Sequence, residues 1–544
     1  MGPATDPITA EVVARYLFLA AEEMGATLTR TAFSPNIKER ADCSSAIFDA
    51  NGDVIAQAHR VPIHLGSMIG TVATLRRRFP EDQIQPGDMF VANDPYNGGG
   101  THLPDINVVA PVFRGGRIVA FVANIAHHAD VGGMVPGSEA SVCRSIFQEG
   151  LRLPLVRVMR GGEVNRDVVD IILLNSRTPE ERIGDLKAQF AANFVGIQRV
   201  EALFEKYTDA GAAAAIAGFL DFTERRFAAA IDRLPAGTYS DVDYLDGDEP
   251  GHTVPIRATL TVGGGKLRFD FTGSAPQLNS SRNIPRQALL DTIYTVAKCL
   301  LDPDLPANAG YYRTIEAVTE PGSCIDPKLP GAVGTRSITC GVLGDLVAAL
   351  LSQAQPDKAL ARSGPHHLMV LSGTDPRTGR YFVNYETVAG GMGARAQRDG
   401  MDAVRIHASG AANLPAEALE HAFPFVIETY ALRDGSGGGG QHRGGLGVVR
   451  DYRVIADDVT VSLSSERQAV AATGLAGGGD GATGVFILDP GTPTEQVLPS
   501  AAAEVRLPRG SVLRVCTPGG GGFGSMAARE PTAVARDGRE GRVS

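Results

Sequence analysis

The residues with the clearest chemical potential lie in the segment 93–105, which reads NDPYNGGGTHLPD. His102 and Asp105 follow a run of three glycines in this segment. Imidazole and carboxylate groups together form a ligand set for a divalent metal such as zinc, manganese or iron(II). Because Pro104 interrupts a continuous helix, we expect the two side chains to converge through a turn.

A second group of candidate ligands follows further along the chain. His127, His128 and Asp130 lie at the end of an apolar segment that reads RIVAFVANIAHH. Adjacent residues of a strand point to opposite faces, so only one of the two histidines can readily join His102, and the other would support it. The spacing leaves open which histidine binds. The competing interpretation is that polar residues collect at strand ends and loops in any protein.

Other polar residues are weaker candidates on pattern alone. Asp42 enters a predicted strand, and most loop aspartates are turn or cap residues. His59 and His64, in AHRVPIHLG, belong to a type that is more often structural or solvent-facing. The remaining polar candidates are Arg336, Glu386, Arg395 and His407.

The elements that must position these residues follow from the hydrophobic spacing. Apolar residues recur every three to four positions over residues 7–31, which predicts an amphipathic helix. Two apolar runs surround Asn51-Gly52 within residues 44–58, which predicts a β-hairpin. Residues 88–130 are interpreted as a strand, a glycine-rich loop and two more strands joined by a turn at residues 115–116.

The rest of the chain alternates between helical and strand patterns. Residues 178–233 predict two or three helices, and residues 256–271 predict a second hairpin before a helix within residues 287–301. The glycine runs at 437–440 and 519–522 are interpreted as turns. Helix-rich and sheet-rich segments in this order indicate an α+β fold, with mixed, largely antiparallel sheets and helical segments.

These elements suggest four parts of the chain. Residues 1–175 form the N-terminal metal-site region, residues 176–235 a helical segment, and residues 236–524 a glycine-rich C-terminal α+β region. Residues 525–544 are polar and contain proline and glycine, which predicts a disordered tail.

Composition excludes several classes of function. The 544 residues are 43% apolar and 21% charged, as in a soluble globular protein with a large core. The net charge of -10, without a long basic cluster, argues against a nucleic-acid partner. No signal-peptide or membrane-span pattern is evident. Six cysteines without a CxxC pair predict reduced thiols, and we therefore expect a cytoplasmic protein.

Two familiar catalytic motifs are missing. The GGGK sequence at residues 263–266 lacks the GxxxxGK[ST] frame of a P-loop, so no nucleotide-binding residues are assigned to this chain. No GxSxG elbow supports a serine nucleophile.

The sequence resembles the hydantoinase B/5-oxoprolinase family, which includes metal-binding subunits of N-methylhydantoinase, caprolactamase-type enzymes and acetone or acetophenone carboxylases. The resemblance extends over nearly the whole chain. It rests, in this order, on ERADCSSAIFDANGDVIAQ, VPIHLGSM, VANDPYNGGGTHLPDI, ANIAHHADVGG, GTRSITCG and TPGGGGFG.

The resemblance implies a division of labour between two chains of a hetero-oligomer. A hydantoinase A-type subunit would use ATP to phosphorylate the ring carbonyl oxygen of a cyclic amide, such as a hydantoin, 5-oxoproline or another lactam. This subunit would then complete hydrolysis at a divalent metal. His128 or Asp130 could move the proton. Carried over position by position, the metal ligands would be Asp42, His102, Asp105 and His127.

Two other functions are alternatives. The first is a subunit of an ATP-dependent carboxylase that acts on a ketone such as acetone or acetophenone. The absence of an obvious large insertion favours hydrolysis. The second is an assembly protein with a purely structural metal, for which the protein would supply every ligand.

Overall fold

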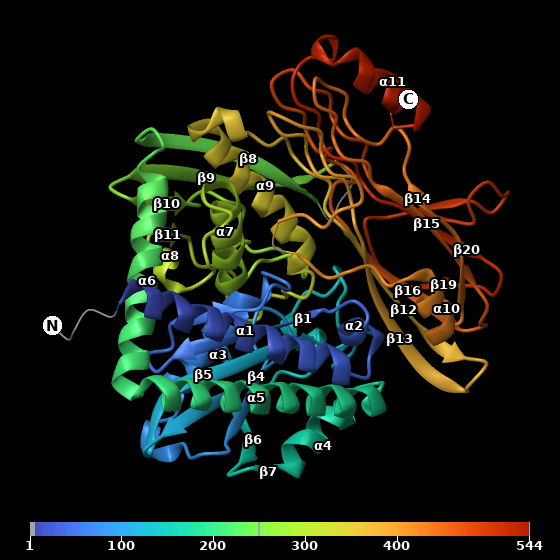
Figure 1. The fold of residues 1–544 in the computed structure, drawn as a ribbon. Helices are drawn as coiled ribbons and strands as arrows, with labels where there is room; N and C mark the ends of the chain where they lie inside the picture. The colour runs from blue at the N-terminus through green and yellow to red at the C-terminus, as the bar shows by residue number, and fades with distance from the viewer. Residues whose placement is uncertain (1–5, 248–250, 408, 543–544) are drawn as a thin grey trace.

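The computed structural model describes residues 6–247, 251–407 and 409–542. A layered part, which comprises about the first two-thirds of the chain, lies beside a C-terminal β-sandwich (Figure 1). Strands pair antiparallel in its four sheets, apart from β10 (Lys266–Asp270) with β11 (Ile315–Val318). The expected α+β fold is confirmed.

The central sheet of the layered part has the strand order β2-β1-β5-β4-β3-β6-β7. Both predicted features of this region are confirmed: β1 and β2 form a hairpin, and β4 and β5 meet at a turn of two glycines with positive φ. The strands are β1 Cys43–Asp49, β2 Val54–Gln57, β3 Met89–Ala92, β4 Asp105–Arg114, β5 Arg117–His127, β6 Val156–Arg160 and β7 Glu163–Val164.

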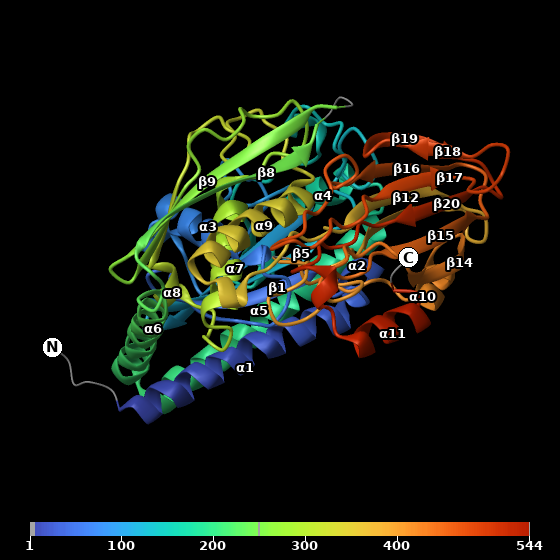
Figure 2. The ribbon, with the colours of Figure 1, turned by 90° about the horizontal axis from the view of Figure 1, so that it is seen from above.

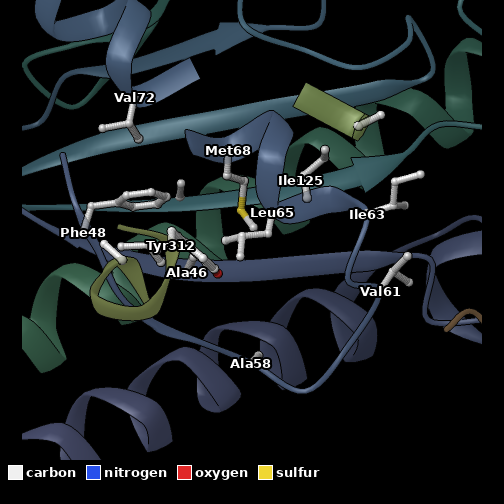
Figure 3. Close-up of a cluster of buried hydrophobic side chains, with 14 of the residues drawn as sticks. Ala46, Phe48, Ala58, Val61, Ile63, Leu65, Met68, Val72, Ile125 and Tyr312 are labelled. Atoms are coloured by element: carbon white, nitrogen blue, oxygen red, sulfur yellow. The ribbon is translucent and has the colours of Figure 1, made fainter. Parts of the chain in front are cut away.

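Helices cover both faces of the central sheet. The long helices α1 (Pro7–Thr31) and α5 (Pro179–Tyr207) run side by side along one face (Figure 2). Helix α3 (His64–Arg78) packs on the other face. Figure 3 shows the resulting core, in which Leu65, Met68 and Val72 of α3 lie against Ala46 and Phe48 of β1 and Ile125 of β5.

A second helix layer and a second sheet lie beyond α3. Helix α7 (Arg286–Leu301) packs against α3 and α9 (Arg336–Ala354), and α9 packs against β8 (Gly237–Asp246) and β9 (Thr253–Gly263). The sheet has the order β11-β10-β9-β8. Helix α9 is long and apolar enough to suit a membrane span by composition, but it is mostly buried inside the protein, where an apolar helix needs no lipid.

Two or three helices were predicted between residues 178 and 233, and the structure has two, α5 and α6 (Asp209–Ile231). Because α5 packs directly on β4 and β5, this segment belongs to the layered core. The four-part division of the chain stays a prediction. The remaining helices of the layered part are α2 (Pro35–Lys38), α4 (Arg166–Asn175) and α8 (Ala309–Tyr312).

The C-terminal sandwich packs two sheets around a shared apolar core. One sheet comprises β13 (Arg380–Val388), β12 (His367–Asp375), β16 (Val459–Ser464) and β19 (Ala501–Leu507), in this spatial order. The other comprises β14 (Phe425–Leu432), β15 (Val448–Val454), β20 (Val512–Cys516), β17 (Val485–Leu488) and β18 (Gln496–Leu498). Helix α10 (Ala416–Ala422) packs on β14.

The glycine runs at 437–440 and 519–522 are not the turns that we expected, since none of these glycines lies in a hydrogen-bonded turn. They are segments that pack backbone against backbone. The N–H of Gly520 donates to the carbonyl oxygen of Gly445 at 2.9 Å, and Gly438 donates to Gly520 at 2.9 Å. A Cβ on Gly520 would lie 2.2 Å from the carbonyl oxygen of Met392. Close packing of distant segments therefore explains these glycines.

The C-terminal segment also differs from the expectation of disorder. Helix α11 (Pro531–Arg539) follows a short 3-10 helix at Met526–Ala528, and Arg529 pairs with Asp399 at 2.8 Å and with Asp537 at 2.5 Å. Ion pairs to a distant loop hold this polar segment in place. Residues 543–544 lie outside the described residues.

Candidate metal centre

The candidate metal centre lies where β4 begins and β5 ends. Asp105, the first residue of β4, is paired in register with His127, the last residue of β5. The preceding loop carries His102 and packs closely against α3. Gly99 has φ +83°, and a Cβ there would lie 2.1 Å from the backbone of Gly70 in α3. The glycine run thus allows the loop to approach α3 and present His102 beside Asp105.

The three side chains form a compact, buried cluster. One potential ligand atom of each of His102, Asp105 and His127 lies within 4.8 Å of the other two. All three residues are at most 2% exposed. The convergence of His102 and Asp105, expected from the sequence, is therefore present, and β5 supplies the third group.

The hydrogen bonds of His102 indicate that the cluster lacks a donor for its buried acceptor atoms. Its Nδ1–H donates to the carbonyl oxygen of Gly334 at 2.9 Å, so Nε2 carries a lone pair in the neutral ring. That lone pair lies 3.0 Å from Oδ2 of Asp105, which is also an acceptor. Neither His102 Nε2 nor Asp105 Oδ1 has a hydrogen-bond partner among the described residues. Buried acceptors in this arrangement fit a bound cation.

Charge states at neutral pH agree with a cation site. Burial and the nearby Arg336 lower the pKa of His102, so its ring is neutral. Burial alone would raise the pKa of Asp105, but His102, His64 and Arg336 hold it well below its usual value. Burial lowers the pKa of His127 to about 3. Two neutral imidazoles and one carboxylate are a donor set that zinc, manganese and iron accept.

The structure distinguishes the two adjacent histidines. His127 lies on the α3 face of the sheet, and its ring stacks on Tyr385 with centroids 4.2 Å apart. His128 instead lies beside α5, where its Nε2 is 3.0 Å from Oε1 of Gln189. Only one histidine joins His102, as strand alternation predicts, and it is His127.

The geometry does not support the proton-transfer roles expected of His128 and Asp130. His128 is turned toward α5 because it follows His127 by one residue. Asp130 accepts the N–H groups of Gly132 at 3.1 Å and Gly137 at 2.9 Å, and it pairs with Arg177 at 2.9 Å. Its carboxylate stabilises the loop after β5.

Asp42 and His64 extend the cluster. His64, the first residue of α3, places Nε2 3.6 Å from Oδ1 of Asp42 and 3.5 Å from Oδ1 of Asp105. Asp42 thus lies next to the three-residue group through His64. His64, a weak candidate by sequence, comes to the cluster because α3 begins beneath the sheet.

Two further residues, Arg336 and Glu139, contact the side chains of the cluster. Arg336, at the start of α9, donates to Oδ2 of Asp105 at 2.5 Å. Oε2 of Glu139 lies 3.2 Å from Nε2 of His127, while its Oε1 has no hydrogen-bond partner among the described residues. Burial raises the pKa of Glu139 well above its usual value. No spacing signal identified Glu139, because it comes from an irregular loop.

The other polar candidates lie outside the cluster. Glu386 accepts from Arg450 at 2.6 Å and from Tyr452 at 2.9 Å inside the sandwich. The other two, His407 and Arg395, bond to Asp345 and to the carbonyl oxygen of Asp399, respectively. The ring of His59 packs edge-to-face against Phe18 of α1, with centroids 4.8 Å apart.

The fold and the site together define a class: an α+β protein with a buried histidine–aspartate cluster, a candidate metal centre, at the ends of two inner strands of the central sheet. The particular family follows from sequence comparison. The model of the Hydantoinase B/oxoprolinase family matches residues 6–526, and the chain belongs to this family.

Two relatives are similar to this chain, one of comparable length and one much longer. It is 32% identical to a putative D-/L-hydantoinase subunit of Pseudomonas sp., covering 99% of this chain and 93% of that one. It is also 32% identical to 5-oxoprolinase 1 of Arabidopsis thaliana, covering 93% of this chain. The chain spans only 41% of that 5-oxoprolinase.

Two solved structures share the fold. The ATP-dependent caprolactamase from Pseudomonas jessenii superposes with a TM-score of 0.91 at 28% identity, covering 99% of this chain and 94% of that chain. Acetone carboxylase superposes with a TM-score of 0.91 at 20% identity, covering 98% and 78%. The second likeness shows the fold alone, so the fold does not separate hydrolysis from carboxylation.

Proposed function

We propose that this chain is the metal-binding subunit of an ATP-dependent cyclic-amide hydrolase, which acts with a hydantoinase A-type ATP-binding subunit. The observation that carries the proposal is the buried pair of acceptors, His102 Nε2 and Asp105 Oδ2, only 3.0 Å apart. Support for the reaction comes from the similarity to a D-/L-hydantoinase subunit and to an ATP-dependent caprolactamase.

The residues that would hold a divalent metal are His102, Asp105 and His127, with Asp42 as the proposed fourth ligand. When bound, such a metal lowers the pKa of a water molecule toward neutrality and favours attack on a carbonyl-derived carbon. Phosphorylation of the ring oxygen by the partner would weaken amide resonance and make that carbon attackable. Arg336 fixes Asp105 through a charge-assisted hydrogen bond.

Glu139 is the proposed proton carrier, in place of His128 and Asp130. Burial raises the pKa of this carboxyl well above its usual value, which favours the protonated form, and Oε1 has no hydrogen-bond partner among the described residues. Cleavage of the ring C–N bond leaves a nitrogen that needs a proton, and a protonated carboxyl in the site can supply one. The attacking water replaces this proton, and a second water then cleaves the resulting acyl phosphate and releases inorganic phosphate.

The test is turnover by this chain co-expressed with its hydantoinase A-type partner. We expect hydrolysis of hydantoin, 5-oxoproline or caprolactam that depends on ATP and yields the ring-opened product. Bicarbonate should have no effect. Turnover of a ketone that requires bicarbonate and forms a carboxylated product would instead show that the chain serves a carboxylase.

A variant pair tests the role of Glu139. Glu139→Gln should lower kcat by about 10²–10⁴-fold without changing metal content. Glu466→Gln is the matched control, because Glu466 is also buried with a raised pKa but lies in a different ion-pair network. Equal turnover by Glu139→Gln and the wild type would exclude Glu139 as the proton carrier.

The expected cytoplasmic location stays a prediction. All six cysteines are free, which agrees with reduced thiols. Fractionation of the native host tests the location directly.

A further inference from the structure

Arg40 and Arg405 are two inward-facing arginines without an ion-pair partner. Arg40 is 1% exposed and Arg405 is partly exposed, yet neither has a carboxylate oxygen within 4.0 Å among the described residues. Other buried arginines of the described chain do form such ion pairs. They are Arg182, Arg282, Arg336, Arg443, Arg450, Arg467 and Arg529.

The two guanidinium groups lie side by side. Arg40 Nε donates to the carbonyl oxygen of Ala412 at 3.2 Å, and Arg405 Nε donates to that of Ala411 at 3.1 Å. Both Nη2 atoms donate to the same hydroxyl oxygen, Oγ1 of Thr387. Two like charges that share one hydroxyl acceptor repel each other.

Nearby acidic groups leave this positive charge largely unbalanced. Burial and the charge of Arg40 together lower the pKa of Arg405 to about 10, although Asp42, Tyr385 and Glu386 oppose the shift. Neither carboxylate is in ion-pair contact with the two arginines. Glu386 is already paired with Arg450 at 2.6 Å, and Asp42 adjoins His64 in the metal cluster.

The arginine pair adjoins the metal centre. The guanidinium of Arg40 lies over the ring of Tyr385, 5.2 Å from its centroid, and Tyr385 stacks on His127. Arg40 Nη1 also donates to Asn36 at 2.6 Å, and Asn36 donates to the carbonyl oxygen of His127 at 2.8 Å. A single intervening side chain therefore separates Arg40 from a proposed metal ligand.

We infer that Arg40 and Arg405 form an oxyanion-binding site that holds the phosphoryl group of the activated substrate next to the metal centre. Arg405 Nη1 has no hydrogen-bond partner among the described residues, so a planar donor group remains available on the partly exposed side. Guanidinium groups bind phosphate and carboxylate through paired N–H donors. The phosphoryl assignment rests on the proposed function, whereas a substrate carboxylate would offer similar chemistry.

The experiment measures anion binding to the purified chain at constant ionic strength, with no ATP or partner subunit. Inorganic phosphate and acetate serve as the two probes in titration calorimetry. We expect wild type to bind phosphate and Arg405→Ala to bind it at least tenfold more weakly. Arg405→Lys keeps the charge but loses the paired N–H donors of the guanidinium, and its phosphate affinity should lie between those of the wild type and Arg405→Ala. Arg398→Ala is the matched control, because Arg398 is exposed on the preceding loop and should bind like wild type.

The same titrations after chelation separate this site from phosphate bound at a metal. Arg405-dependent phosphate binding that persists without metal supports the inference. Acetate binding that depends on Arg405, without phosphate binding, supports the oxyanion site but overturns its phosphoryl assignment. Equal phosphate affinity in wild type, Arg405→Lys and Arg405→Ala, or no binding of either anion by wild type, would overturn the site. Arg405-dependent phosphate binding without ATP-dependent turnover would count against the proposed function alone.

Discussion

The metal cluster and the ion-pair network around Arg467 are both buried and charged, but they differ in how charge is balanced. Arg467 binds Asp243 through two hydrogen bonds of 3.0 and 2.9 Å and reaches Asp345 at 3.2 Å. His407 lies 2.8 Å from the other oxygen of Asp345. Each carboxylate in this network has a donor from the protein.

In the metal cluster, by contrast, acceptors face one another. His102 Nε2 and Asp105 Oδ1 have no hydrogen-bond partner among the described residues. A buried acceptor without a donor is costly, so a cluster of them fits a cation that the chain does not supply. The Arg467 network needs none, because it joins β8, α9 and the loop after β16 with its own side chains. The missing donors, and not burial or charge, distinguish a candidate metal centre from a structural network.

The largest effect should come from removing a ligand. His102→Ala should abolish stoichiometric metal and lower turnover by more than 10³-fold, which corresponds to about 4 kcal/mol or more. Metal analysis and kinetics with the partner measure both quantities. His128→Gln is the matched control, since this buried neighbour bonds to Gln189 and should keep the metal. Full metal content in His102→Ala would contradict the site.

Breaking the self-balanced network should instead affect stability. Arg467→Ala leaves Asp243 and Asp345 without their main cationic partner and should lower the free energy of unfolding by about 3–5 kcal/mol. Metal content should not change. Denaturant unfolding provides the measurement. Arg509→Ala, which removes an exposed ion pair with Asp457, should cost less than about 1 kcal/mol. Similar decreases in the free energy of unfolding of the two variants would show that burial of the Arg467 network does not strengthen its contribution to stability.

Chelation should destabilise only proteins that bind the metal. If free metal stands at about 100 times its dissociation constant, its removal should cost about 2.7 kcal/mol, which thermal unfolding detects. Arg467→Ala should show the same chelator-induced drop, and His102→Ala should show none. A drop of equal size in His102→Ala would place the stabilising metal elsewhere.

The smallest effect concerns pH. Burial raises the pKa of Glu466, beside Arg282 and Asp246, to about 8. The folded protein then holds a proton that the unfolded chain has released, so this stabilisation is full below the ordinary glutamate pKa and is lost as pH rises to about 8. Glu466→Gln should flatten the stability profile between about pH 5 and 8 by about 1–2 kcal/mol. Parallel profiles for the two proteins would contradict the raised pKa.

Elements with strong local patterns were predictable from the sequence. Helix α1 has the predicted bounds, Pro7–Thr31, because its apolar spacing and its start at a proline are local signals. Asn51-Gly52 and Gly115-Gly116 similarly placed two hairpins. The glycine-rich segments and α11 were not predictable in this way. Their structure depends on backbone contacts such as Gly520 with Met392, and on ion pairs such as Arg529 with Asp399, between residues far apart in sequence.

The candidate site shows the same difference between features set by local sequence patterns and features set by long-range contacts. Sequence alone determined the residue types of the loop NDPYNGGGTHLPD and limited the second histidine to His127 or His128, because strand alternation is a local rule. Only the tertiary structure placed His127 on the α3 face. Only tertiary packing brought Glu139 and Arg336 to the cluster and Arg405 to Arg40, since these contacts join loops and helices that no periodic pattern connects.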